Sequence, residues 1–394
     1  MKRRQLLKAT LALSATTAGG RLFAAPGTDA KLLIVFLRGG YDAATLLVPI
    51  SSPYYYQVRP NIAVLRPGSD PNASLPLDAD WGLHPVLRDT VYRLYQDKQA
   101  LFVPFAGIDD LSRSHFETQD SIELGQPLGQ TRDYQSGFLN RLSRVLNGGD
   151  PIAFTDQLPL VFRGTAQIPN IALRNVGKPS LDARQSDIIA RMYQHTALAD
   201  KITEGFEVRD EAMREMAGEM EAANRNAVST KGFELEARRI ARLMREKYSV
   251  GFVDVGGWDT HVGQGGATGA LAGRLEELGR GLAGFADEMG AVWARTVVLV
   301  ISEFGRTFRE NGNRGTDHGH GTVYWALGGA VRGGRVAGEQ IRVEQRTLFQ
   351  DRDFPVLNEY RSIIAGLLAR LYGLSADQLA QVFPGARPMN LELL

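Results

Sequence analysis

The stretch Thr296–Thr322, TVVLVISEFGRTFRENGNRGTDHGHGT, decides the fold class of this chain. Its first part, 296–301, is a β-branched apolar run, which is typical of a strand buried on both faces of a parallel sheet. Ser302 and Glu303 end the run. The glycine-rich loop that follows carries three side chains able to bind metals or move protons: Asp317, His318 and His320. Open α/β sheets build their sites at the carboxyl ends of such strands. The stretch therefore predicts an α/β protein with a site at this edge of the sheet.

Composition narrows the possible functions. The chain has 394 residues, 44% hydrophobic and 23% charged, as in an ordinary soluble globular protein. A formal net charge of +1 gives no basis for binding nucleic acid or an anionic membrane. Cysteine is absent, which excludes disulfides and thiol nucleophiles. A metal site would have to use oxygen and imidazole ligands.

The first 25 residues have the pattern of an export signal. Basic residues precede a moderately apolar segment, 6–18, which is too short and too rich in Ala, Thr and Ser to span a bilayer. Arg3 and Arg4 resemble the twin-arginine signal, the alternative being an ordinary Sec-type signal. We expect residues 1–25 to direct export through the twin-arginine translocase to the periplasm or the extracellular space. Residues 26–394 then form a single domain.

Two further apolar runs also end in acidic side chains. The run 31–37 leads through a glycine turn to Asp42, for which the alternative role is a helix N-cap. The run 249–255 contains Asp254 and leads to Asp259-x-His261 on another glycine-supported turn. This spacing allows a carboxylate and an imidazole to bind or flank one ion.

A third apolar run, 101–105, is followed by the segment GIDDLSRSHFETQD, residues 107–120. Ser114 stands three residues before Glu117, which fits a capping box that opens a helix. Alternatively, a hydroxyl at a helix N-terminus can be a nucleophile, and Ser112 competes with Ser114 for that role. The neighbours Arg113 and His115 could hold an oxyanion or a metal.

The helices are expected to cover the sheet. Residues 182–247 are dominated by Ala, Glu, Arg and Met at helical spacing, and predict a helical insertion over the sheet or the site. An amphipathic helix is expected at 271–294 and a last one at 360–372.

Carboxylates and imidazoles thus recur after several strands, which favours a divalent metal site. Without thiolates such a site suits Zn²⁺, Mn²⁺ or Fe²⁺, and a carboxylate-rich subset suits Ca²⁺ or Mg²⁺. Arg38, Arg113 and Arg306 lie near the candidate ligands, and guanidinium groups can bind phosphate or sulfate oxygens in a bidentate way. Alternatively, Arg306 only neutralises Glu303.

Five motifs give the chain a resemblance to a known family: FLRGGYDAATLLVP, SRSHFETQD, FVDVGGWDTH, VISEFGRT and DHGHG. Together with the twin-arginine signal they resemble the bacterial exported proteins grouped as domain of unknown function 1501. The resemblance covers nearly the whole mature chain. It implies the alkaline phosphatase and sulfatase superfamily, with a doubly wound, mainly parallel sheet flanked by helices and a two-metal site at the carboxyl ends of the strands.

The resemblance also assigns residues. Those that match the superfamily's metal ligands are Asp42, Asp259, His261, Glu303, His318 and His320. Ser114, or Ser112, matches the nucleophile by position. Ser302-Glu303 stands where the superfamily usually has an Asp-His pair.

These observations predict an exported metal-dependent hydrolase of phosphate or sulfate esters, acting on a small-molecule or glycan substrate. One or two divalent ions, Zn, Mn or Ca, would bind the six ligands. Ser114 would attack, or a metal-activated hydroxide if Ser114 is only a cap, while Arg306 or Arg113 holds the transferred group. The alternative is a non-catalytic cell-envelope protein that binds a glycan or a partner chain.

Overall fold

The computed structural model describes residues 29–147, 149–172, 191–194, 196, 198–202 and 232–394. The expected signal at 1–25 and most of the insertion expected at 182–247 lie outside these residues. The end of the stretch 182–247 is described, and it contains the helix α9, Phe233–Glu246.

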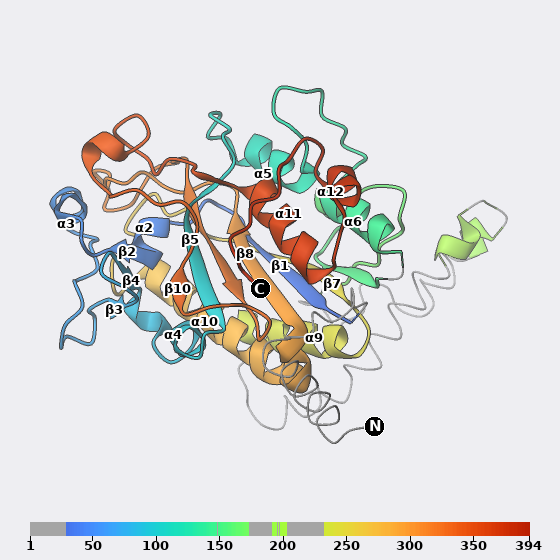
Figure 1. Ribbon diagram of the computed structural model, residues 1–394, viewed down its shortest axis with the longest axis horizontal. Coiled ribbons are helices and arrows are strands. Elements are labelled where there is room, and N and C mark those ends of the chain that lie inside the picture. Colours follow the sequence, from blue (N-terminus) through green and yellow to red (C-terminus); the bar gives the residue numbers. More distant parts are fainter. Residues whose placement is uncertain (1–28, 148, 173–190, 195, 197, 203–231) are drawn as a thin grey trace, which may run out of the picture.

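The chain forms an eight-stranded sheet in the order β10-β5-β9-β8-β1-β7-β6, with β11 also paired to β5 (Figure 1). The strands are β1 (Lys31–Leu37), β5 (Ala100–Gly107), β6 (Pro151–Phe154), β7 (Val250–Val255), β8 (Thr296–Ser302), β9 (Thr322–Leu327), β10 (Arg335–Val336) and β11 (Asn358–Glu359). Only β9 among these described strands runs against the others. The predicted α/β fold with a mostly parallel sheet is confirmed.

The central strand β1 is buried on both faces, as its continuous apolar run predicts. Leu33, Val35 and Leu37 pack into the core on one face of the sheet. The alternate residues Leu32, Ile34 and Phe36 pack into a second core on the other face. Because successive side chains of a strand point to opposite faces, an all-apolar strand requires cover on both sides.

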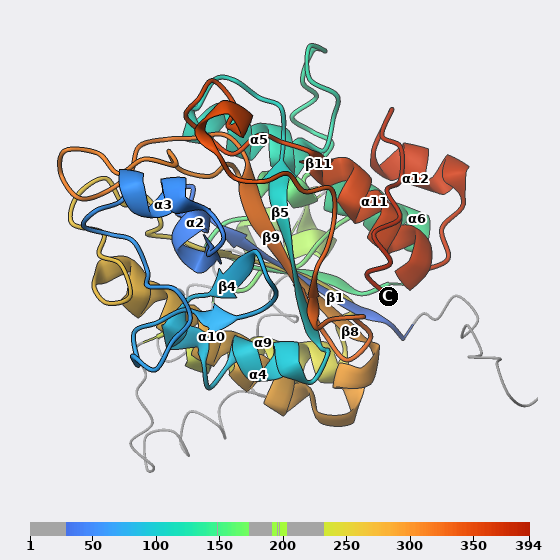
Figure 2. The same cartoon turned by 60° about the vertical axis from the view of Figure 1, so that its left-hand side comes forward.

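Helices supply that cover in two layers (Figures 1 and 2). The helices whose apolar residues join the first core are α2 (Ala43–Leu46), α3 (Pro53–Val58), α4 (Val91–Gln96), α9 and α10 (Ala270–Met289). Those that join the second core are α5 (His115–Leu124), α6 (Phe138–Leu146), α11 (Tyr360–Leu371) and α12 (Ala376–Val382). Among the described helices, none is long and apolar enough to cross a membrane.

Short elements complete the fold. A three-stranded antiparallel sheet consists of β2 (Leu47–Pro49), β4 (Trp81–Leu83) and β3 (Leu75–Pro76). The 3₁₀ helices are η1 (Pro85–Leu87), η2 (Leu160–Phe162), η4 (Gly290–Arg295) and η5 (Gln345–Thr347). The helix expected at 271–294 is therefore α10 continued by η4.

His84, which precedes η1, makes the stability of this fold dependent on pH. Its ring is fully buried and contacts the Gly266 carbonyl at 3.0 Å. Burial lowers the pKa of His84 from 6.5 to about 4. The unfolded chain therefore binds this proton at a higher pH than the folded chain. The contribution of neutral His84 to the unfolding free energy is therefore fully present above about pH 6.5, and it is lost as the pH falls towards 4.

We expect this single group to remove about 3 kcal/mol of unfolding free energy between pH 7 and pH 4. Urea denaturation of the wild type and of His84→Gln across this range measures the effect, because the difference between the two curves isolates His84. The same pH slope in both proteins would contradict the assignment.

Candidate metal centre

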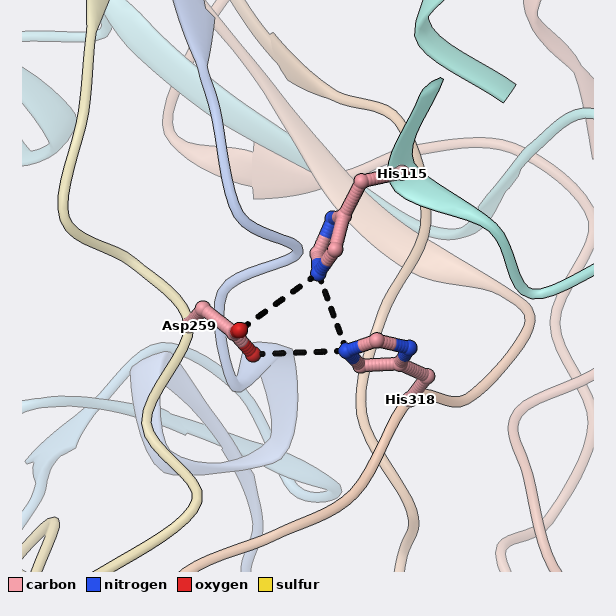
Figure 3. A group of neighbouring side chains, drawn as sticks. All are labelled: His115, Asp259 and His318. Atoms are coloured by element: carbon pink, nitrogen blue, oxygen red, sulfur yellow. Dashed lines mark hydrogen bonds and ion pairs between the residues drawn. The ribbon is translucent and has the colours of Figure 1, made fainter. Parts of the chain in front are cut away.

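Loops at the carboxyl ends of β5, β7 and β8 bring three potential metal ligands together. His115 opens α5 after β5, Asp259 follows β7, and His318 lies in the glycine-rich loop after β8. One ligand atom from each lies within 4.8 Å of the others (Figure 3). Segments far apart in the sequence therefore meet at the edge where the apolar runs predicted a site.

His261 joins the same group. Its Nε2 lies 2.9 Å from Asp259 Oδ1 and 3.2 Å from His318 Nε2. The Nε2 atoms of His115 and His318 are 2.9 Å apart. Asp259 completes the contacts, with Oδ1 3.4 Å from His318 Nε2 and Oδ2 3.6 Å from His115 Nε2. We call His115, Asp259, His261 and His318 the ligand cluster.

The other ring nitrogen of each histidine faces an oxygen atom. The three Nδ1 contacts are His115 to Glu303 Oε1 at 2.8 Å, His318 to the Arg113 carbonyl at 3.0 Å and His261 to Asp317 Oδ1 at 3.3 Å. Carbonyl and ionised carboxylate oxygens only accept hydrogen bonds, so each Nδ1 carries the proton of a neutral ring. This is how proteins commonly fix the tautomer of a metal-binding histidine.

The two carboxylates in these contacts are ionised at neutral pH. Burial raises the pKa of Glu303, but hydrogen bonds from His115 and Gln119 outweigh burial, and the pKa lies below its usual value. A hydrogen bond from Asn311 lowers the pKa of Asp317. Both groups are therefore acceptors, as the Nδ1–H tautomer requires.

The arrangement fits a divalent cation. With Nδ1 protonated, the Nε2 lone pairs of His115 and His318 converge beside the Asp259 carboxylate, and His261 Nε2 lies 3.2 Å from His318 Nε2 on the side. Lone pairs this close repel one another unless a proton or a metal ion lies between them. Burial lowers the pKa of His318, so this ring is neutral near pH 7, the form that binds metals. Three imidazoles and one carboxylate suit Zn²⁺, Mn²⁺ or Fe²⁺ better than Ca²⁺ or Mg²⁺.

Arg306 orients one member of the ligand cluster. Its buried guanidinium donates to Asp259 Oδ1 at 2.5 Å and also to the carbonyl of Thr316. Burial raises the pKa of Asp259, but the hydrogen bond and charge of Arg306 outweigh it and keep the pKa below its usual value. Arg306 therefore pairs with Asp259, whereas the sequence suggested either an ester oxygen or Glu303 as its partner.

Ser114 lies beside the ligand cluster. It occupies the N-cap position of α5, but its side chain makes no capping hydrogen bond in the described structure. The expected capping box is therefore not formed, and Ser112 Oγ instead accepts from the Ser114 backbone N–H at 3.3 Å. The residues on both sides of Ser114 contact His318: Arg113 through its carbonyl and His115 through Nε2.

The structure places two of the predicted ligands elsewhere. Both oxygens of the buried Asp42 carboxylate accept from Arg59, at 2.5 Å and 3.0 Å. His320 is buried, packs against Phe349 with the ring planes tilted by 32° and contacts Asp109 Oδ1 through Nε2 at 3.1 Å. Glu303 is close to the cluster, but its contact is with Nδ1 of His115, which places it behind a ligand.

Arg113 is also engaged, since its Nη2 donates to Asp353 Oδ2 at 2.9 Å and to Gln350 Oε1 at 2.8 Å. His115 belongs to the ligand cluster, but it is not among the six residues that the sequence analysis matched to the superfamily's metal ligands. The sequence signal that points to it is its place at the start of a helix, after the loop that follows a buried strand.

Most of the chain matches a known protein family. The family described as "Protein of unknown function (DUF1501)" matches residues 29–383. The chain belongs to this family. The match covers all the elements that carry the ligand cluster, and it confirms the family resemblance seen in the motifs. A search of curated proteins gave no match.

Solved structures similar to this DUF1501 chain include the lipoteichoic acid synthase LtaP from Listeria monocytogenes, with TM-score 0.41, 8% identity, and 94% of this chain and 78% of that chain covered. A protein in the alkaline phosphatase superfamily from Vibrio parahaemolyticus has TM-score 0.35, 12% identity and coverages of 83% and 69%. Ps i-CgsB in complex with k-i-k-neocarrahexaose has TM-score 0.37, 9% identity and coverages of 92% and 75%. Scores this low carry no argument about activity.

Proposed function

We propose that this chain is a metal-dependent hydrolase of phosphate or sulfate esters. The observation that supports this most strongly is the convergence of His115, His318 and Asp259, with His261 in contact with the latter two, and each of the four is backed by a second group. The second groups are Glu303, the Arg113 carbonyl and Asp317 for the histidines, and Arg306 for Asp259. Such supported ligands are typical of functional metal sites.

A divalent ion held by these ligands supplies Lewis acidity, which activates an oxygen nucleophile and stabilises negative charge on phosphoryl or sulfuryl oxygens. Two arginines near the site are already paired: Arg306 with Asp259 and Arg113 with Asp353. We therefore assign these two arginines to positioning roles rather than to direct contact with the substrate. The ligand side chains are partly exposed, from 21% for His115 to 42% for Asp259, which gives an ester access.

Ser114 is the proposed nucleophile, with water as the alternative. Attack by Ser114 Oγ on phosphorus or sulfur forms a covalent ester and breaks the bond to the leaving alcohol, which takes a proton. Water then hydrolyses the new ester and restores the hydroxyl. The absence of a capping bond leaves the Ser114 hydroxyl without that structural role in the described structure.

Activity assays test the proposal. Aryl phosphates, phosphodiesters and aryl sulfates are offered to the protein loaded in turn with Zn²⁺, Mn²⁺ and Ca²⁺. We expect hydrolysis of at least one class, a loss of more than about 100-fold in kcat for Ser114→Ala, and unchanged thermal stability of that variant. Ser112→Ala tests the competing candidate: a comparable loss in that variant, with activity kept in Ser114→Ala, would assign the nucleophile to Ser112 instead. No hydrolysis with any metal would leave the binding-protein alternative.

We also propose export by the twin-arginine pathway, because Arg3 and Arg4 precede the short apolar segment. Replacing both arginines by lysine keeps the charge and is expected to retain the protein in the cytoplasm. Cell fractionation with an antibody measures this. Unchanged export of the lysine variant would instead support the Sec-type signal.

A further inference from the structure

Gln264, in the loop after β7, connects the two loops that carry most of the ligand cluster. Its side chain is fully buried. Its Oε1 accepts hydrogen bonds from the hydroxyl groups of Thr260 at 3.0 Å and Thr316 at 2.9 Å. Thr260 stands between Asp259 and His261, and Thr316 stands two residues before His318. One amide oxygen therefore joins the two ligand loops, in addition to backbone hydrogen bonds such as that from Thr316 N–H to the Thr260 carbonyl at 3.1 Å.

The nitrogen of the same amide is held by an anchor, the buried ion pair of Asp42 and Arg59. Gln264 Nε2 donates to Asp42 Oδ2, and Thr45 Oγ1 lies 3.4 Å away. Asp42 is in turn paired with Arg59, whose Nε donates to the Phe308 carbonyl at 2.6 Å. Because Asp42 is an ionised acceptor, the amide nitrogen must face it and the amide oxygen must face the two threonines. The anchor thus fixes the orientation of the amide.

Thr316 extends this connection to Asp259 by a second route. Its hydroxyl is 3.3 Å from Arg306 Nε, and its carbonyl accepts from Arg306 Nη2. Arg306 then holds Asp259. A change at Gln264 therefore alters the support of Asp259 through both Thr260 and Thr316.

We propose that Gln264 is a positioning residue for the metal centre. Its side chain sets the distance between the Asp259–His261 turn and the His318 loop. This rests on the proposed metal-binding role of the ligand cluster. It also gives a function to Asp42, one of the predicted metal ligands that lie outside the cluster: Asp42 orients the amide that contacts both ligand loops.

Gln264→Met tests the proposal, since methionine has a similar length and makes none of these hydrogen bonds. We expect the affinity for Zn²⁺, measured by competition with a chromophoric chelator, to fall about 10- to 100-fold. The visible absorption spectrum of bound Co²⁺ should change, because that spectrum reports the geometry of the ligands. Neither readout requires enzyme activity.

Asn140→Leu is the matched control. Asn140 is a buried amide on α6 that donates to the carbonyls of Phe162 and Ala166, both at 2.8 Å, in the core on the other face of the sheet. Its loss should lower stability but leave Zn²⁺ affinity and the Co²⁺ spectrum unchanged. Should Gln264→Met fail to fold, Thr260→Val removes one hydroxyl at nearly constant volume and should weaken Zn²⁺ binding more than Asn140→Leu.

The outcomes separate this inference from the proposed function. Wild-type protein that binds no metal would overturn both. Wild-type protein that binds Zn²⁺, with Gln264→Met or Thr260→Val binding it equally well, would overturn the positioning role alone. Equal weakening by Asn140→Leu would also overturn it, because the effect would then follow general stability.

Discussion

His318→Ala is expected to weaken Zn²⁺ or Mn²⁺ binding by more than about 100-fold, beyond the loss typical of a residue behind a ligand. Its Nε2 lies 2.9 Å from that of His115, 3.2 Å from that of His261 and 3.4 Å from Asp259 Oδ1, so it contacts every other member of the cluster. Titration against a chromophoric chelator measures the affinity. Hydrolysis of any ester that the wild type accepts should fall in parallel.

The neighbouring His320 supplies the control. His320→Asn changes a histidine of the same loop whose Nε2 contacts Asp109 instead of the ligand cluster. We expect His320→Asn to keep the metal affinity of the wild type. In the absence of metal, His318→Ala should unfold at nearly the same temperature as the metal-free wild type, which would show that its fold is intact. Equal losses of affinity in the two variants would contradict the assignment of ligands.

Arg59→Met is expected to lower the unfolding free energy by about 3–5 kcal/mol at pH 7, because it leaves the Asp42 carboxylate buried without its cation. Arg59 is fully buried and also donates to the carbonyls of Thr307 and Phe308, so it joins Asp42, in the turn after β1, to the loop after β8. Urea denaturation measures the loss. A decrease below about 1 kcal/mol, typical of an exposed ion pair, would contradict this role.

The pH dependence of Arg59→Met gives a second check. In the wild type, burial raises the pKa of Asp42, but the charge of Arg59 outweighs burial and holds the pKa below its usual value. The pair therefore stabilises the protein above about pH 4, and this contribution is lost as the pH falls further. Without Arg59, burial raises the Asp42 pKa, so the deficit of the variant should shrink as the solution is acidified.

Apolar runs predicted much of this architecture because burial on both faces leaves a strong signal in the sequence. The runs 31–37 and 296–301 became β1 and β8, which pair in parallel with Lys31 opposite Thr296. Parallel strands end at one edge of the sheet, so the loops that follow them were expected to meet. The geometry of His318 and Asp259 agrees with that expectation.

The roles of individual polar residues were harder to predict. Asp42 follows a strand as a metal ligand would, but its partner Arg59 lies in an irregular segment, and no periodic pattern shows which way that segment folds back. Likewise, spacing placed Arg306 near Glu303, whereas the turn of the loop directs it to Asp259. A sequence pattern indicates which loops meet, but the side-chain directions depend on packing that the pattern does not contain.

The most direct test is elemental analysis of the wild-type protein, purified without chelator and then equilibrated with Zn²⁺ or Mn²⁺, beside the double variant His115→Ala, His318→Ala. The convergence of imidazole nitrogens predicts about one equivalent of a transition metal per chain in the wild type and a small fraction of that in the variant. A folded wild-type protein without bound metal, or a double variant that retains the full equivalent, would contradict the metal centre.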